Sequence, residues 1–373
     1  MPRRIIHCTN VHRWDDVRIF HKMARSTAAA GFDTHVVAID RDATAASQFV
    51  RDGATVHLLP GTDIRSRAKR ALAGGNRVAA MAASLDGDIV HIHDPELLPF
   101  LVTRRFGRAK RIFDAHEDLS GQVQSKPWIP AAAQPIFGLI ARSLEAAAGR
   151  ADALLAATPF IAAKLGHGAL AIQNFPLLSE FPPAQGRSRS PASIGLYAGG
   201  ITRTRGILQM IEAVGLCEAV RRVHLAGTFE SEAMLAEARA LRGWTKVEYH
   251  GFLPREKLVP LFAEADFGLL TLLPEPNYVN SQPTKLFEYM SAGLPVVASD
   301  FPRWRELIGD DSIAEFVDPA NPRSIAAGID RLLRRLEGDR AAIAATARRL
   351  VEDRFSWDAE FKKLKTLYER LLA

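Results

Sequence analysis

The stretch Asn280–Asp300, NSQPTKLFEYMSAGLPVVASD, decides the fold, because it combines a loop, a helix, a glycine stop and a buried strand. Pro283 suits the first turn of a helix, where its missing N–H group costs nothing. Gly293 is expected to end that helix, and Leu294–Ala298 form a short apolar run. Such a run after a helix is typical of a strand in a parallel sheet.

The start of this helix has the features of an anion site. Ser281 or Gln282 can cap it. We expect the N–H groups of Thr284, Lys285 and Leu286 to be free and to face the preceding loop. A helix N-terminus of this kind favours a phosphate, and Lys285 adds a full positive charge.

Glu288 lies one helical turn beyond Lys285, on the same face. Its carboxylate is about 5 Å from the anion-binding end, a distance at which it can accept hydrogen bonds from two neighbouring ribose hydroxyls. Leu286, Phe287 and Met290 belong to the core side. The helix therefore predicts a binding site for a nucleoside diphosphate. The alternative is an ordinary βα unit in which Glu288 is solvated.

The bulk composition indicates a globular chain of two domains. The chain has 373 residues, of which 47% are hydrophobic and 24% charged. No apolar run reaches the ~20 residues of a membrane-spanning helix, and we see no secretory signal. The only two cysteines, Cys8 and Cys217, exclude a disulfide framework and favour a cytoplasmic location.

The net charge of +6 comes from an excess of arginine, with clusters at 65–70 and 104–111. No nucleic-acid-binding motif accompanies them, so we expect no nucleic-acid partner. The clusters are either a solvated surface or a contact with anionic lipid at the inner membrane. Trp128, Ile129, Ile136 and Phe137 could add apolar membrane contacts, or they pack in the core.

Apolar runs alternate with helical patterns along the chain, which predicts α/β domains with parallel sheets. The expected strands of the first domain are 4–8, 34–39, 55–59, 88–92, 111–113 and 153–156. Those of the second are 194–198, 222–226, 247–249, 267–270, 295–298 and 313–316. The expected division is a first domain at 1–180, a Pro-rich linker at 181–193, a second domain at 194–354 and a C-terminal helix at 355–373 that packs on the first domain.

Several motifs together resemble retaining GT-B glycosyltransferases, specifically the large family 4. In the second half these are YAGGITRTRGILQMIEAV, HLAGTF, YHGFLPREKLVPLFAEADFGLL and PTKLFEYMSAGLPVVASD. In the first half they are DVRIFHKMARSTAAAGFDTHVVA, HIHDPELLP and FDAHEDL. The resemblance covers nearly the whole chain and implies two facing Rossmann-like domains with a central cleft.

The resemblance also implies roles for individual residues. Glu288 stands at the ribose-binding position, Arg205 and Lys285 at the donor diphosphate, and His116 at the histidine that contacts the transferred sugar. His116 could also be satisfied within a polar loop. The wider donor set is Gly199, Gly200, Arg203, Gly227, Gly251, Phe252, Leu253, Asn280, Thr284 and Leu286. The acceptor set is Asp16, Arg18, His93, Asp94 and Glu117, of which Asp16 and Arg18 could instead cap the first helix.

Two positions depart from the family pattern. Where members often carry a first glutamate eight positions before Glu288, with seven residues between the two, this chain has Asn280, which supplies hydrogen bonds but no charge. Many members place arginine after the loop glycine, where this chain has Gly200, and Arg203 is a candidate substitute.

These observations predict a retaining transferase that moves a sugar from a nucleoside diphosphate, with UDP preferred, to a glycan or lipid-linked glycan during surface polysaccharide synthesis. We expect no cofactor. His91, His93 and Asp94 could suggest a metal site, but no further ligand cluster is near in sequence, so none is expected. The rival functions are a sugar-nucleotide epimerase of the same fold and a non-catalytic sugar-nucleotide-binding scaffold.

Overall fold

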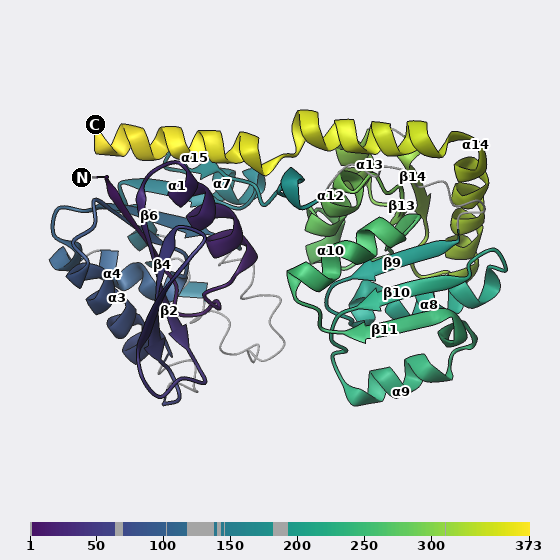
Figure 1. Ribbon diagram of the computed structural model, residues 1–373, viewed down its shortest axis with the longest axis horizontal. Coiled ribbons are helices and arrows are strands. Elements are labelled where there is room, and N and C mark those ends of the chain that lie inside the picture. The colour runs from purple at the N-terminus through teal and green to yellow at the C-terminus, as the bar shows by residue number, and fades with distance from the viewer. Residues whose placement is uncertain are drawn as a thin grey trace. The chain divides into compact units, whose positions relative to one another are not determined.

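The structure is a computed structural model that describes residues 2–63, 70–101, 103–117, 138–139, 143–144, 146–181, 193–309 and 311–373 of the chain. It divides into two compact units (Figure 1). Unit 1 comprises Met1–Asn174 and Trp357–Ala373, and unit 2 comprises Phe175–Ser356.

The described part of unit 1 contains an eight-stranded sheet in the order β3-β4-β2-β1-β5-β6-β7-β8. All neighbouring strands are parallel except β3, which pairs antiparallel with β4 at one edge. The strands are β1 (Arg4–Cys8), β2 (Asp33–Asp40), β3 (Ser47–Arg51), β4 (Ala54–Pro60), β5 (Ile89–Ile92), β6 (Lys110–Ala115), β7 (Ala153–Ala156) and β8 (Leu170–Ala171). The strand order reverses between β1 and β5, where open α/β sheets bind ligands beyond their carboxyl ends.

The helices of unit 1 begin with a π-helical segment, η1 (Val17–Ala24), which continues as α1 (Arg25–Ala29). The others are η2 (Arg70–Gly74), α3 (Gly75–Ser84), η3 (Pro95–Leu97), α4 (Leu98–Leu101), η4 (Arg104–Phe106), α7 (Pro159–Leu165) and α15 (Trp357–Leu372). The amphipathic helix α15 returns to this unit, where Trp357 Nε1 donates to Ser26 Oγ at 2.9 Å and Tyr368 is fully buried.

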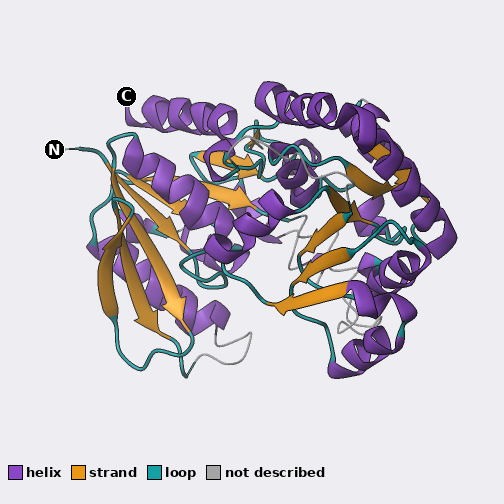
Figure 2. Cartoon of the chain, turned by 45° about the vertical axis from the view of Figure 1, so that its right-hand side comes forward, coloured by secondary structure: helices purple, strands orange, loops and turns teal. Residues whose placement is uncertain are grey.

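Unit 2 contains a fully parallel sheet of six described strands in the order β11-β10-β9-β12-β13-β14. The strands are β9 (Ile194–Ala198), β10 (Arg222–Ala226), β11 (Val247–Gly251), β12 (Phe267–Leu270), β13 (Val296–Ser299) and β14 (Ala314–Val317). Figure 2 shows helices flanking the strands of each unit. Large buried side chains, among them Trp304, Phe267 and Tyr289, fill the core of unit 2.

The helices of unit 2 follow its strands in regular alternation. They are η6 (Leu178–Glu180), η7 (Arg203–Arg205), α8 (Ile207–Leu216), α9 (Glu232–Ala240), η8 (Arg242–Lys246), α10 (Arg255–Glu264), α11 (Pro276–Val279), α12 (Thr284–Ser291), α13 (Pro302–Ile308), η9 (Asp311–Ile313) and α14 (Pro322–Arg354). Asp339 has non-helical dihedral angles inside α14, so two helical segments meet there at a kink.

The units divide earlier than the sequence predicted. The first domain was expected to reach residue 180, but Phe175 already belongs to unit 2. The reason is aromatic packing, because the Phe175 ring lies 5.0 Å from that of Phe287 and 5.2 Å from that of Phe355. Residues 182–192 of the expected linker lie outside the described part of the chain.

Candidate active site

Two cations converge on the loop that follows β9 in unit 2. The atoms of Lys285 and Arg205 crowd Gly199 so closely that a Cβ there would lie 2.0 Å from Lys285 Cε and 3.3 Å from Arg205 Nη1. Arg205 Nη1 also donates to the carbonyl of Gly200 at 3.1 Å, and Tyr197 donates to the same oxygen at 2.8 Å. The loop therefore holds two positive side chains at the carboxyl edge of the sheet.

The loops after β10 and β11 adjoin the same place. Gly227 N donates to the carbonyl of Gly251 at 2.7 Å, and a Cβ on Gly227 would lie 1.7 Å from the carbonyl oxygen of Gly199. Gly199 and Gly227 have φ of +147° and +150°, which favours glycine. Three of the glycines selected from the sequence are thus brought together, because only glycine permits these loops to touch.

Lys285 is half-buried, and its charge is sensitive to its neighbours. Burial lowers the pKa of its amine, Glu288 raises it, and the guanidinium groups of Arg205 and Arg255 lower it further. An anion placed beside Lys285 and Arg205 relieves this repulsion. The chemistry of the site therefore favours a negatively charged ligand.

Glu288 is bound by Arg255, an arginine inside one of the quoted motifs to which the sequence analysis gave no role. Arg255 Nη1 donates to Glu288 Oε1 at 2.6 Å, and Arg255 Nη2 donates to Glu180 Oε2 at 2.6 Å. Both side chains of the Arg255–Glu288 pair are less than one-fifth exposed. Residues 255 and 288 share no local pattern, so only the fold reveals this pair.

The start of α12 differs from the prediction in three details. Pro283 is the residue before the helix rather than its first member, and no side chain caps that end. Ser281 Oγ donates instead to the carbonyl of Tyr278 at 2.8 Å. The N–H group of Leu286 is not free, because it donates to the carbonyl of Pro283 at 3.0 Å, and its side chain is buried. The Leu286 side chain belongs to the core, as the sequence predicted, and a contact of this residue with the donor stays a prediction.

The remaining predicted donor residues lie at the surface or along its edge. Phe252 is 78% exposed directly after β11, whereas Leu253 packs partly on the core. Asn280 is exposed at the end of α11, and Thr284 is half-buried at the start of α12. Arg203 is exposed and paired with Glu237, so its guanidinium is held by an acidic side chain of unit 2.

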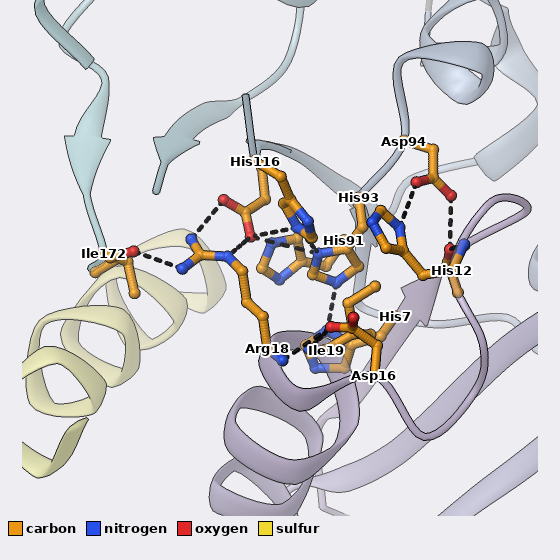
Figure 3. Close-up of polar contacts among 12 residues, drawn as sticks. His7, His12, Asp16, Arg18, Ile19, His91, His93, Asp94, His116 and Ile172 are labelled. Carbon is orange, nitrogen blue, oxygen red and sulfur yellow. Dashed lines mark hydrogen bonds and ion pairs between the residues drawn. The ribbon is translucent and has the colours of Figure 1, made fainter. Parts of the chain in front are cut away.

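In unit 1, a buried ion pair organises the predicted acceptor residues (Figure 3). Arg18, on η1, donates from Nε and Nη2 to the two oxygens of Asp114 at 2.8 and 2.7 Å. Arg18 Nη1 also donates to the carbonyl of Ile172 at 2.7 Å. Both side chains are almost completely buried. Arg18 therefore fixes the end of β6, and its positive charge is balanced by Asp114 inside unit 1.

Histidines extend this network from Asp114 toward the surface. Asp114 Oδ2 lies 3.4 Å from His93 Nδ1 and 3.3 Å from His116 Nε2. Burial lowers the pKa of His93 to about 3, although Asp114 opposes the shift. His116 is partly exposed after β6, so it is the member of the group that a ligand can reach, and Glu117 beside it is exposed.

Asp94 holds the loop after β1. Its carboxylate accepts hydrogen bonds from Thr9 Oγ1 at 2.6 Å, from the N–H groups of Asn10 and Val11, and from His12 Nδ1 at 2.7 Å. Burial would raise the pKa of Asp94, but the hydrogen bond from His12 and its charge outweigh this effect and lower it to about 2. Asp94 is buried and shapes the loop.

Asp16 caps the first helix, one of the two roles that its sequence position allowed. Its side chain accepts from the N–H groups of Arg18 and Ile19 at 2.8 and 3.0 Å. This cap fixes the start of η1 and so the direction from which Arg18 reaches Asp114.

The expected membrane contact has no support from the described residues. Arg111 is bound to Asp152 and to the carbonyl of Leu101, and Arg105 is bound to Asn76. The apolar stretch 128–137 and residues 65–69 lie outside the described part of the chain. None of the described helices is both long enough and apolar enough to cross a membrane.

Both halves of the chain match family models of glycosyltransferases. Residues 17–169 match the model of the glycosyl transferase 4-like domain, and residues 192–335 match that of glycosyl transferases group 1. Together these matches cover most of the chain.

Two relatives match part of the sequence. An uncharacterized glycosyltransferase of Methanocaldococcus jannaschii is 30% identical over 47% of this chain and 44% of its own length. O-antigen chain mannosyltransferase B of Escherichia coli is 28% identical over 44% of this chain and 42% of its own length. The chain thus spans less than half the length of these relatives.

Solved structures confirm the fold. Anabaena HepE in complex with UDP has a TM-score of 0.69 and 14% identity, and the likeness covers 99% of this chain and 100% of that one. The expected GT-B fold class, with two Rossmann-like doubly wound domains, is confirmed.

Proposed function

We propose that this chain, a glycosyltransferase of the GT-B type by its fold and its two family domains, moves a sugar from a nucleoside diphosphate to a hydroxyl acceptor with retention of configuration. The observation that carries the proposal is the convergence of Lys285 and Arg205 on the glycine loop after β9, one turn from the Glu288 carboxylate. Two cations and a nearby carboxylate match the diphosphate and ribose of such a donor.

The reaction requires positive groups that stabilise the negative charge developing on the diphosphate as it departs. Lys285 and Arg205 are already in place, so they stabilise the leaving group without reorganisation. The leaving phosphate takes the proton of the acceptor hydroxyl on the same face, so no protein nucleophile is needed. His116 contacts the transferred sugar, and Asp114 orients its ring.

For the donor nucleotide we propose UDP, the ligand with which Anabaena HepE was crystallised. For the acceptor we propose a glycan or a lipid-linked glycan in surface polysaccharide synthesis, in keeping with the O-antigen relative of Escherichia coli. A cytoplasmic location remains our expectation, and both cysteines of the chain are buried and free.

The direct test incubates the protein with a panel of nucleoside diphosphate sugars and measures release of the nucleoside diphosphate, with and without added oligosaccharide or lipid-linked acceptors. We expect UDP release that an acceptor accelerates, and NMR of the product should show the anomeric configuration of the donor. Binding without release would favour a scaffold, and conversion of the free sugar nucleotide to its epimer would favour an epimerase. An inverted product would contradict retention.

The roles of the two cations have their own kinetic test. Because charge on the diphosphate grows in the transition state, Arg205→Ala should lower kcat by ~10²-fold or more with a smaller effect on the donor KM. Arg331→Ala is the matched control, since Arg331 is exposed, is paired with Glu315 and does not belong to the predicted donor residues. A change in KM alone would show that Arg205 binds only the ground state.

A further inference from the structure

Three histidines converge on one face of the sheet of unit 1, at the point where its strand order reverses. His7 on β1 and His91 on β5 are direct partners in the parallel register. His93 follows His91 by two positions, and strand residues two apart face the same side. One ring nitrogen of each histidine lies within 4.8 Å of those of the other two, and all three residues are buried. Figure 3 shows the rings grouped together.

The surroundings orient these rings in the way that metal-binding histidines are usually oriented. Asp114 faces His93 Nδ1 at 3.4 Å, and the hydroxyl of Tyr368, from α15, lies 2.8 Å from His91 Nδ1. Since a carboxylate only accepts, His93 carries its proton on Nδ1 and offers the lone pair of Nε2. Such outer contacts fix the tautomer and orientation of a ligating histidine.

Two nitrogens of the group have no hydrogen-bond partner among the described residues. They are His7 Nε2 and His91 Nε2, and both are buried. A buried polar atom without a partner costs about 1–3 kcal/mol, so two of them in one cluster need a physical reason. His7 Nδ1 and His93 Nε2 lie 3.0 Å apart as a hydrogen-bonded pair, and an ion bound by His93 Nε2 would replace this hydrogen bond.

We propose that His7, His91 and His93 bind one divalent late first-row transition-metal ion, with zinc as the favoured occupant. Zinc–nitrogen bonds of ~2.0–2.1 Å at tetrahedral angles place ligand nitrogens roughly 3.3 Å apart. Since the nitrogens lie within 4.8 Å of one another, movements of up to about 1.5 Å close the site. Three imidazoles complete a tetrahedral site with one further ligand. Asp94, considered with His91 and His93 from the sequence, is not part of the cluster, because its carboxylate is bound to the loop after β1.

The ion would tie β1 to β5 directly behind His116. His93 Nδ1 lies 3.2 Å from His116 Nε2, so the site connects to the histidine proposed to contact the sugar. The site does not depend on the proposed transfer reaction, because its ligands are buried in the core of unit 1. It is therefore tested by metal binding itself.

The test uses the full chain without a histidine tag, loaded separately with Zn²⁺ and Co²⁺ and passed through gel filtration. We expect about one metal ion per chain by mass spectrometry, and visible cobalt absorption of a tetrahedral nitrogen site. His91→Gln should lower the retained metal at least tenfold. His35→Gln is the matched control, since His35 pairs with His57 at 2.9 Å in the same sheet without a third ligand, and it should retain the ion.

Equal metal content in the wild type and His91→Gln would place the ion elsewhere, for example at His224, Glu248 and His250 of unit 2, and would overturn the proposal. Less than about 0.1 ion per loaded wild-type chain would also overturn it. If His91→Gln does not fold, X-ray absorption of the zinc-loaded wild type decides. Imidazole nitrogens near 2.0 Å support the site, and a shell of oxygen or sulfur without imidazole contradicts it.

Discussion

Arg255 Nη1 donates to Glu288 Oε1 at 2.6 Å, although the two residues are 33 positions apart. The same arginine binds Glu180, so it holds Glu288 in one orientation at the side of α12 that faces Lys285 and Arg205. If Glu288 accepts the ribose hydroxyls, as we propose, Arg255 positions that carboxylate for them.

A double-mutant cycle tests this coupling. Arg255→Met should weaken UDP binding about tenfold, roughly 1.4 kcal/mol, because Glu288 loses its fixed orientation. In the Glu288→Ala background the same change should have little further effect, since both residues act through one carboxylate. Calorimetric titration of the four proteins measures the coupling. Additive losses would mean that Arg255 binds the nucleotide independently.

Gly199→Ala should disrupt the loop after β9 more than the addition of a single methyl group suggests. The added Cβ would meet Lys285 Cε at 2.0 Å, and φ of +147° strains any other residue. We expect at least a tenfold loss of UDP affinity with unfolding temperature lowered by a few degrees. Gly31→Ala is the matched control, because Gly31 has φ of +90° with nothing within 4 Å of the added carbon. If Gly199→Ala and Gly31→Ala changed the affinity for UDP equally, the clash with Lys285 would not explain the loss.

The lowered pKa of Lys285 predicts proton uptake on nucleotide binding at alkaline pH. Burial keeps this pKa below its usual range in the free protein, and a bound diphosphate should raise it, so the amine binds a proton as the nucleotide enters. Calorimetry near pH 9 in buffers of different ionisation enthalpy measures the uptake.

Lys285→Arg supplies the control for that measurement. It retains the charge but does not titrate in this range, so UDP should still bind, without the uptake. Uptake that persists in Lys285→Arg would assign the proton to another group.

The Arg18–Asp114 pair should be essential for the stability of unit 1. Arg18→Met leaves a buried carboxylate without its counter-charge and should lower the free energy of unfolding by about 3–5 kcal/mol. Adding Asp114→Asn should recover part of this loss, because it removes the uncompensated charge. Chemical denaturation of the single and double variants gives the values. A loss below 1 kcal/mol in Arg18→Met would contradict the role of the pair.

Much of the fold could be predicted from the sequence, because it depends on local patterns. Apolar runs bounded by polar residues located β1, β7, β9, β10 and β12 with the observed bounds. Two strands were not predicted: β3, whose residues are half-buried or exposed, and β8, which has only two residues. Edge strands of this kind bury too little apolar surface to leave a clear pattern.

The site was predictable where chemistry depends on glycine or on spacing along one helix. Gly199 and Gly227 have backbone angles that glycine favours, and Lys285 and Glu288 share a helix. Contacts between distant segments were not predictable. Arg255 reaches Glu288 because α10 and α12 lie close together in the fold, and His7 joins His91 and His93 because β1 pairs with β5. Local sequence patterns do not indicate which strands and helices become neighbours in the fold.

The central claim is that unit 2 binds a nucleoside diphosphate through Glu288, and calorimetric titration of UDP into the wild type and Glu288→Ala tests it most directly. Glu306→Ala is the control, because Glu306 is exposed and paired only with Arg303 among the described residues. We predict one UDP per wild-type chain, affinity weaker by about 1.5–3 kcal/mol in Glu288→Ala and no change in Glu306→Ala. Absence of UDP binding to the wild type, or equal affinity in Glu288→Ala, would contradict the claim.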